Sequence, residues 1–172
     1  AAGTNYGSAV SNVLAFTISR ADISPTVTVS NWTYGENANT PSVNGNVGNG
    51  TITYKYKVKG ANDSTYTTTV PTNAGEYTLN AIIEQSTNYN GGTATVNFKI
   101  NPKNISNVTI GAIADQSYTG NKITPKPSVS DGNKNLVLNT DFTYSYENNT
   151  NVGTATVTVV GKGNYTGTAT KT

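Results

Sequence analysis

An Asn-Tyr pair followed within two residues by glycine occurs three times in this chain, at Asn5-Tyr6, Asn88-Tyr89 and Asn164-Tyr165. The successive spacings are 83 and 76 residues. A repeat of this length indicates tandem modules that each close a small core, rather than one large domain. Tandem modules usually hold, bind or space other molecules, so the build of the chain predicts a non-catalytic function.

A second motif comes into register when the Asn-Tyr pairs are aligned. FTISRADIS, residues 16–24, lies over FKINPKNIS, residues 98–106, and each ends a strand on Phe-x-Ile before a short polar joint. We therefore predict modules at residues 21–101 and 102–172, with residues 1–20 as the final strand of a preceding repeat or an N-terminal exchange strand. Shorter matches support the alignment: Thr72–Gly75 with Thr150–Gly153, Pro41–Val43 with Pro127–Val129, Tyr54-x-Tyr56 with Tyr144-x-Tyr146, and Tyr34-Gly35 with Tyr118–Gly120.

The composition and the hydrophobic alternation predict an all-β fold. Apolar residues make up 34% of the chain, and Thr, Asn, Gly, Val and Tyr, which favour strands and turns, are abundant. Period-two alternation places these sets on inward faces: Tyr77, Leu79, Ala81 and Ile83; Ala155, Val157 and Val159; Ile52, Tyr54, Tyr56 and Val58; Ala94, Val96, Phe98 and Ile100. With turn dipeptides such as Asn44-Gly45 and Asp131-Gly132, this predicts two tandem immunoglobulin-like antiparallel β-sandwich modules.

The strand that ends on Phe-x-Ile is complete in the first segment of the chain and incomplete in the last. The first segment carries it complete at Phe16-Thr17-Ile18, whereas Thr172 stands one residue before the position aligned with Phe98. The simpler interpretation is a section of a longer protein, cut without regard to module edges, and the lack of an initiator Met or leader agrees with it. The alternative is that residues 8–18 complete the shortened module of a neighbouring chain by strand addition.

Charge and residue types argue against several classes of function. Eleven Lys plus Arg against nine Asp plus Glu leave a net charge of +2, which is too small for a nucleic-acid surface. The chain has no Cys and no His, so thiol catalysis, Ser-His-Asp triads and most zinc sites are excluded. The acids lie singly along the sequence, and no run of 18 apolar residues occurs. We expect no enzyme activity, no catalytic or metal-binding residues, no cofactor, no nucleic-acid partner and no membrane insertion.

Two groups of residues are weak candidates for ligand binding. Lys55, Lys57 and Lys59 alternate with inward residues and so form a stripe that could dock an anionic wall polymer, although the same stripe could serve to keep the strand soluble. Trp32 and Tyr34 could stack on a sugar ring, although a packing role for Trp32 is favoured because sandwich cores often hold one large aromatic residue.

Five aromatic residues are assigned to stability. Tyr6, Tyr89 and Tyr165 are expected to bury their rings at a strand corner and to hydrogen-bond a backbone group, as in a tyrosine corner. Phe16 and Phe98 are expected to anchor the final strand of each repeat.

The residues also resemble a known family of repeats. The segments NWTYGENANTPSVNGNVGNGTITYKYKVKG and VPTNAGEYTL of the first module look like the MBG and YDG type repeats of bacterial surface proteins. The second module, with DQSYTGNKITPKPSVSDG and LNTDFTYSYENNTNVGTATVTVVGKGNYTGT, is similar to immunoglobulin-like repeats of clostridial surface proteins.

The resemblance implies a secreted protein at the bacterial cell surface, in which such repeats form structural stalks or spacers. Alternatives are an adhesin module that binds carbohydrate or wall polymer, and a pilus-like filament subunit assembled by N-terminal strand donation. The implied partners are neighbouring repeats of the same protein, with other copies by strand exchange and surface glycans as further candidates.

Overall fold

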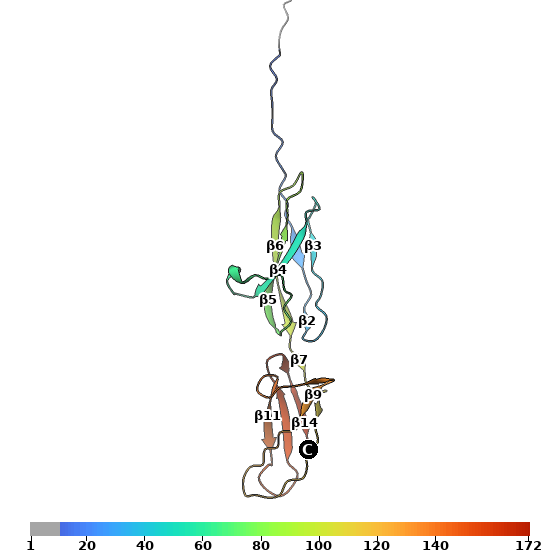
Figure 1. Cartoon of the computed structure of the whole chain (residues 1–172), viewed down its shortest axis with the longest axis vertical. Helices are drawn as coiled ribbons and strands as arrows, with labels where there is room; N and C mark the ends of the chain where they lie inside the picture. Colours follow the sequence, from blue (N-terminus) through green and yellow to red (C-terminus); the bar gives the residue numbers. More distant parts are fainter. Residues whose placement is uncertain (1–10) are drawn as a thin grey trace, which may run out of the picture.

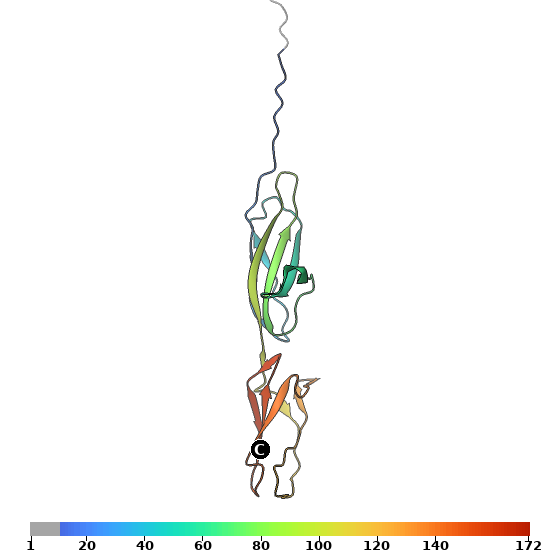
Figure 2. The ribbon, with the colours of Figure 1, turned by 90° about the vertical axis from the view of Figure 1, so that its left-hand side faces the viewer.

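The computed structural model describes residues 11–172 and shows an elongated chain with two groups of strands stacked end to end (Figure 1). We call residues 21–101 the N-terminal part and residues 102–172 the C-terminal part. Residues 11–20 run as an extended, exposed segment away from the outer end of the N-terminal part, and the view turned by 90° shows the same arrangement (Figure 2). Tyr6 and the other residues of the first ten lie outside the described residues.

The all-β character predicted from the sequence is confirmed. Within residues 11–172 the helical content is one short 3-10 turn, η1 (Asp63–Thr65). Over the same range the chain forms no helix of the length and apolarity that crossing a membrane requires.

The N-terminal part is built on one four-stranded sheet and one strand pair. Its strands are β1 (Thr26–Thr28), β2 (Trp32–Thr33), β3 (Ser42–Asn44), β4 (Ile52–Val58), β5 (Gly75–Ile83) and β6 (Gly92–Asn101). The large sheet has the order β2-β6-β5-β4, and β1 pairs with β3. The long strands β4, β5 and β6 are the ones whose alternation the sequence predicts.

The core of the N-terminal part follows that alternation. On β5, Leu79, Ala81 and Ile83 are buried, and on β6 Phe98 and Ile100 are buried while Lys99 between them is exposed. Val27 and Trp32 complete the cluster from the first strands. Val58, predicted to face inward, is instead exposed because it lies at the end of β4.

The C-terminal part contains shorter strands and a separate core. Its strands are β7 (Lys103–Asn104), β8 (Thr109–Ile110), β9 (Val129–Asp131), β10 (Lys134–Asn135), β11 (Phe142–Glu147), β12 (Thr156–Gly161), β13 (Tyr165–Thr166) and β14 (Thr168–Lys171). They form sheets in the orders β10-β9-β8, β11-β12-β14 and β13-β7. Residues Ile105, Phe142, Val159 and Tyr165 are central to its core.

Two features differ from the sequence-based expectation. The pairing is not purely antiparallel, because β2 runs parallel to β6 and β7 runs parallel to β13. In addition β12 begins at Thr156, so Ala155, predicted to face inward, is exposed. The parallel pairs arise because the chain enters each part alongside a late segment of that same part: Ala21 bridges Tyr89, and Lys103 pairs with Tyr165.

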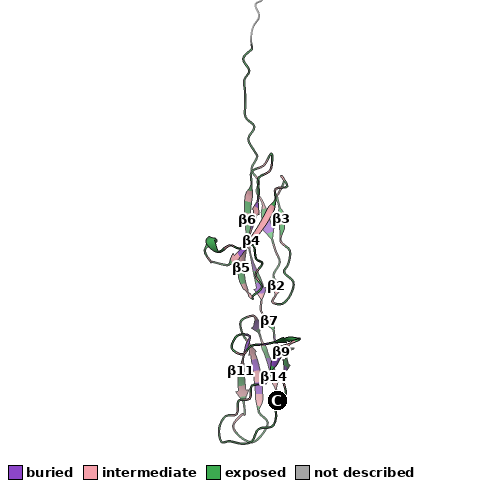
Figure 3. Cartoon of the chain, viewed as in Figure 1, coloured by how far each residue is buried: buried purple, intermediate pink, exposed green. Residues whose placement is uncertain are grey.

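Buried residues are concentrated inside each part, whereas the loops and residues 11–20 consist mainly of exposed residues (Figure 3). The two clusters of buried residues have no member in common, and Tyr34 packs against both. Tyr34 therefore marks the place where the two parts meet.

Candidate functional site

The aromatic ligand candidate Trp32 lies inside the first core. Its side chain is only 6% exposed, and its ring stacks on that of Phe98 with the ring centroids 5.0 Å apart. The face that a sugar would need is therefore occupied by protein, which agrees with the packing role favoured for this residue.

The lysine stripe is largely engaged in contacts within the N-terminal part. Lys57 donates to Asp63 at 2.6 Å and to the Ala61 carbonyl at 2.7 Å, and its ammonium lies 5.0 Å from the centre of the Tyr66 ring. Lys59 donates to Glu76 at 2.9 Å, while Lys55 is half-buried on β4. Two of the three ammonium groups that were weak candidates for docking a polymer, those of Lys57 and Lys59, thus have carboxylate partners.

The pair formed by Lys59 and Glu76 leads to a pH prediction. The hydrogen bond from Lys59 holds the pKa of Glu76 below its usual value of 4.5. A lowered folded-state pKa gives a contribution that is present above the unfolded pKa and is lost as pH falls through the folded value. Because both side chains are about half exposed, we expect Lys59→Gln to leave the urea midpoint unchanged within error at pH 7 and at pH 3. A clear loss at pH 7 that disappears at pH 3 would contradict this.

The aromatic residues assigned to stability are placed as follows. Tyr165 and Phe98 lie in the two cores, and Tyr89 is half-buried. The Tyr165 hydroxyl lies 3.4 Å from the Asp131 carboxylate, which replaces the backbone partner expected for a tyrosine corner. Phe16 is 83% exposed and contributes to neither core.

The structure brings Tyr34 together with residues of the C-terminal part. Its ring meets that of Tyr165 edge to face, with the ring centroids 5.5 Å apart. Its hydroxyl accepts a hydrogen bond of 2.8 Å from Lys134 Nζ, and its backbone N–H donates to the Asn101 carbonyl at 2.8 Å. Tyr34 therefore contacts both the last residue of β6 and the C-terminal part.

Lys134 is the cation at the centre of this contact. It projects from the β9–β10 hairpin, with its ammonium 5.0 Å from the centre of the Tyr34 ring and 5.3 Å from that of Tyr165. This is the range in which a cation is attracted to the face of an aromatic ring. The hydrogen bond to the Tyr34 hydroxyl raises the Lys134 pKa above 10.5, so the ammonium keeps its charge at neutral pH.

Asn164, from the third Asn-Tyr pair, ties the two parts together through its side chain. Its Oδ1 accepts a hydrogen bond of 2.7 Å from the backbone N–H of Ala74, and its Nδ2 donates to Asn73 Oδ1 at 3.1 Å. Its main-chain carbonyl accepts from the Lys103 N–H at 2.9 Å. Asn164 thus contacts both the loop at Asn73 and Ala74 in the N-terminal part and Lys103 at the start of the C-terminal part.

Sequence reasoning missed most of this contact. It identified Tyr34, Tyr165 and the recurrence of Thr72–Gly75, but it assigned no role to Lys134 and did not connect Asn164 with Asn73. The signal that could have linked the last two is that both belong to motifs that recur in the chain.

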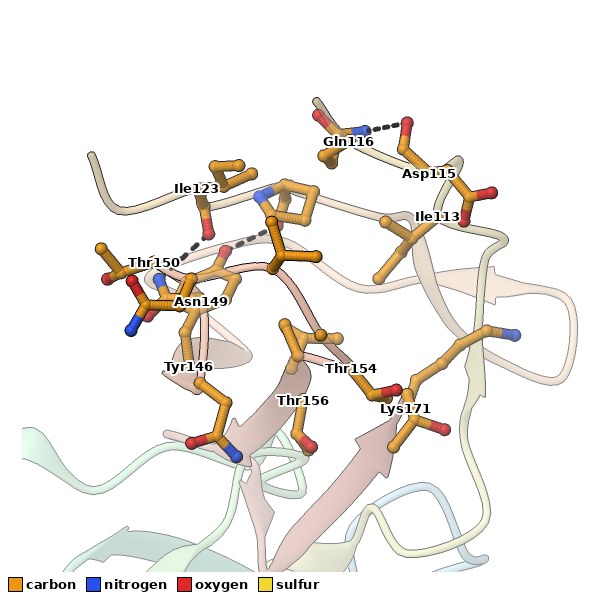
Figure 4. Close-up of a pocket in the computed structure, with 18 of the residues that line it drawn as sticks. Ile113, Asp115, Gln116, Ile123, Tyr146, Asn149, Thr150, Thr154, Thr156 and Lys171 are labelled. Atoms are coloured by element: carbon orange, nitrogen blue, oxygen red, sulfur yellow. Dashed lines mark hydrogen bonds between the residues drawn. The ribbon is translucent and has the colours of Figure 1, made fainter. Parts of the chain in front are cut away.

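A pocket of about 440 Å³ lies at the far end of the C-terminal part. Its walls come from the segment 113–125 and from the loop 148–156, with Tyr146 beside them (Figure 4). The two segments are tied to each other, because the Ile123 N–H donates to the Asn149 carbonyl at 2.8 Å and Asn149 Nδ2 donates back to the Ile123 carbonyl at 3.0 Å. Throughout residues 11–172, no group of three or more His, Cys, Asp or Glu side chains is placed to hold a metal ion.

The sequence matches no protein-family model, and comparison with curated proteins and with solved structures likewise found no similar protein.

Proposed function

We propose that this chain is a stalk or spacer segment of a secreted bacterial surface protein, made of two immunoglobulin-like modules that correspond to the N-terminal and C-terminal parts. The observation that carries the proposal is the contact around Asn164, Tyr34 and Lys134, which joins the facing ends of the two modules. A spacer needs such a contact because a bare linker would let successive modules swing freely.

The joint is short as well as bridged. Asn101 ends β6 and Lys103 begins β7, so one proline separates the last strand of the first module from the first strand of the second. Proline restricts its own backbone and that of the residue before it, which limits the bending that the linker can absorb. The elongated arrangement in Figure 1 is what this joint would maintain.

The adhesin alternative has less support. Trp32 is buried, Tyr34 contacts Lys134, and Lys57 and Lys59 are paired with carboxylates, so four of the five candidate residues make contacts within the chain.

Replacing Asn164 with alanine is expected to loosen the joint without unfolding either module. The change removes two hydrogen bonds between the modules, each contributing roughly 0.5–1.5 kcal/mol, while the half-exposed side chain is not part of a core. Residual dipolar couplings in dilute solution should fit one alignment tensor for the parent chain and two for the variant.

Asn88→Ala provides the matched control, because Asn88 occupies the same position in the preceding Asn-Tyr pair but lies at the outer end of the N-terminal part. It should leave the single tensor unchanged. If the parent chain already needs two independent tensors, the modules are not held together and the spacer proposal loses its basis.

A further inference from the structure

The two parts differ in the loop that follows one pair of corresponding strands. Strands β4 and β11 correspond, because Tyr54-x-Tyr56 aligns with Tyr144-x-Tyr146. Each lies at an edge of its sheet, in the orders β2-β6-β5-β4 and β11-β12-β14. The chain then uses residues 59–74 to reach β5, but only residues 148–155 to reach β12. The loop after β4 is therefore twice as long as the loop after β11.

The longer loop covers the outer edge of β4. The Tyr56 N–H donates to the Thr67 carbonyl at 2.7 Å, and the Thr67 N–H donates back to the Tyr56 carbonyl at 2.9 Å. The side chain of Lys57 holds the start of the same loop through two hydrogen bonds. Lys55 and Lys57 also place positive charge along this edge strand, which discourages pairing with another chain. The edge of β4 is thus protected in two ways.

The outer edge of β11 has no such cover. The Lys162 N–H donates to the Asp141 carbonyl immediately before the β11–β12 ladder, so residues 141, 143, 145 and 147 direct their backbone groups toward β12. The N–H and C=O groups of Tyr144 and Tyr146 therefore point away from β12. Within residues 11–172 these four groups make no hydrogen bond. They form an open template for another strand.

The side chains of β11 also lack the protective charges of β4. Ser145 and Glu147 stand at the positions of Lys55 and Lys57, and both are exposed. The strand reads Phe-Thr-Tyr-Ser-Tyr-Glu, which is rich in strand-forming residues and contains no proline or lysine. β11 lies at the edge of its sheet opposite β14, so the open edge is formed by residues well inside the chain (Figure 1).

We propose that β11 pairs antiparallel with β11 of a second copy, so that one continuous sheet crosses the two C-terminal parts. Tyr144 exchanges both backbone hydrogen bonds with Tyr146 of the second copy, and Tyr146 does the same with Tyr144 of the second copy. The two Ser145 residues then face each other on the twofold axis. Because each copy uses the same surface, the contact closes at two copies.

The side chains favour this register, which makes the strand complementary to itself. On the outer face Glu147 lies opposite Thr143 of the second copy, whose hydroxyl group is a hydrogen-bond donor. On the inner face the rings of Tyr144 and Tyr146 form cross-strand aromatic pairs. Placing Tyr144 opposite Tyr144 would set Glu147 against Asp141, and placing Tyr146 opposite Tyr146 would leave one bonded pair instead of two. Only the proposed register combines two bonded pairs with no meeting of like charges.

Exposed apolar side chains near β11 support a second copy as the partner. Val137 precedes the strand and Val152 follows it, and they are 57% and 89% exposed. Antiparallel pairing places the loop before β11 of one copy beside the loop after β11 of the other. Val137 of each copy therefore lies at the same end of the interface as Val152 of the other, which adds apolar contact to a short strand pair.

The direction of the pairing determines what it joins, and this step rests on the proposed spacer function. β11 runs along the long axis of the chain, so antiparallel pairing makes the two chains run in opposite directions, with their N-terminal parts at opposite ends (Figure 1). Stalks attached to one surface run in the same direction, whereas stalks from two facing surfaces run in opposite directions. The contact would therefore link facing surfaces.

Sedimentation equilibrium over a range of concentrations tests the pairing on the intact chain. We expect a monomer–dimer equilibrium with no larger species, because the contact closes at two copies. A contact of this size is weak, so the dimer should be detected at concentrations up to about 1 mM. A chain that stays monomeric at about 1 mM, or that grows beyond two copies, would overturn the proposal.

Substitutions at Ser145 test the twofold register, and its exposure leaves the fold of each copy unaffected. Ser145→Lys should weaken the dimer about tenfold or more, because two ammonium groups then face each other. Ser145→Thr is the matched control and should stay within about threefold of the parent, since threonine favours strands and adds no charge. An equimolar mixture of Ser145→Lys with Ser145→Glu should recover the dimer as a 1:1 pair. Failure of Ser145→Lys to weaken the dimer, or of the mixture to recover it, contradicts the proposed contact.

Amide hydrogen exchange locates the new hydrogen bonds. The N–H groups of Tyr144 and Tyr146 should exchange more slowly as the concentration of the chain rises, because only the dimer protects them. The Tyr56 N–H, which is bonded within its own copy, is the internal control and should not depend on concentration. Exchange at Tyr144 and Tyr146 that is independent of concentration in a sample that dimerises would place the interface elsewhere and reject the pairing.

Disulfide trapping tests the same register covalently. The chain has no cysteine, and residues facing each other in a non-hydrogen-bonded pair are about 4.5 Å apart between Cα atoms, which a disulfide can span. Ser145→Cys should therefore give one covalent dimer on oxidation, whereas Thr95→Cys, an exposed control on β6, should give far less. Equal linking by the two variants would count against the register. These variants lie outside the Asn164 contact, so the spacer function and the β11 pairing can fail separately.

Discussion

Replacing Phe98 with alanine is expected to lower the unfolding free energy of the N-terminal part by about 3–5 kcal/mol. Phe98 is 4% exposed and contacts three aromatic rings, with centroid distances of 5.0 Å to Trp32, 5.6 Å to Tyr77 and 6.2 Å to Tyr56. Its removal leaves a cavity that stiff, stacked rings cannot close. Urea denaturation followed by Trp32 fluorescence measures this, because Trp32 is the one tryptophan in the chain and lies in this core.

The Phe-x-Ile motif supplies its own control. Phe16 belongs to the first copy of the motif but is exposed. Phe16→Ala should therefore change the free energy of unfolding, measured by urea denaturation, by no more than about 0.5 kcal/mol. A cost for Phe98→Ala below about 1.5 kcal/mol would mean that the core of the N-terminal part is not organised around this ring.

Replacing Tyr165 with alanine is expected to have a comparable effect on the C-terminal part, about 3 kcal/mol or more, and to weaken the joint at the same time. Tyr165 is buried in the second core, and its ring also meets Tyr34 and lies under Lys134. Thermal unfolding monitored by NMR, which resolves signals from both parts, should show the C-terminal signals melting at a lower temperature.

Tyr165→Phe distinguishes the contribution of the ring to the free energy of unfolding from that of the hydroxyl group. The ring contacts remain, and the lost hydrogen bond to Asp131 is long at 3.4 Å, so a cost of about 1 kcal/mol or less is expected. A double-mutant cycle of Tyr165→Ala with Tyr34→Ala should show a coupling of about 0.5–1.5 kcal/mol, the range measured for aromatic pairs. If the two changes in the free energy of unfolding simply add, the two rings lie next to each other without a stabilising interaction between them.

The strands that the sequence predicts best are those with a long, regular alternation. Leu79, Ala81 and Ile83 occupy every second position of a nine-residue strand, and their burial follows directly from the period of two, even though Ile82 on the other face is also apolar. Ala155 shows the limit of this reasoning, because β12 begins at Thr156 and Ala155 is exposed, although it continues the alternation of Val157 and Val159.

The contact between the parts was harder to predict for a related reason. Lys134 and Tyr34 are 100 residues apart, and their hydrogen bond depends on how the β9–β10 hairpin faces the end of the preceding part. The parallel pairs were missed because alternation identifies a strand but not its neighbour or direction. Repetition was the more useful signal: the recurring Asn-Tyr pair identified Asn164 and Tyr165, even though the first role assigned to it was local stability.

The constant register between the first and last segments of the N-terminal part has a mechanical consequence. Ala21 bridges Tyr89 and Trp32 pairs with Ile100, both in parallel and with the same offset, while Thr26–Thr28 between them pairs with β3 instead. Tension applied along the chain would enter at Ala21 and leave at Asn101. It would therefore slide the two segments past each other and strain several hydrogen bonds together, instead of peeling them apart one by one. Resistance to pulling would then come from the direction of the strands, independently of how stable the fold is at rest.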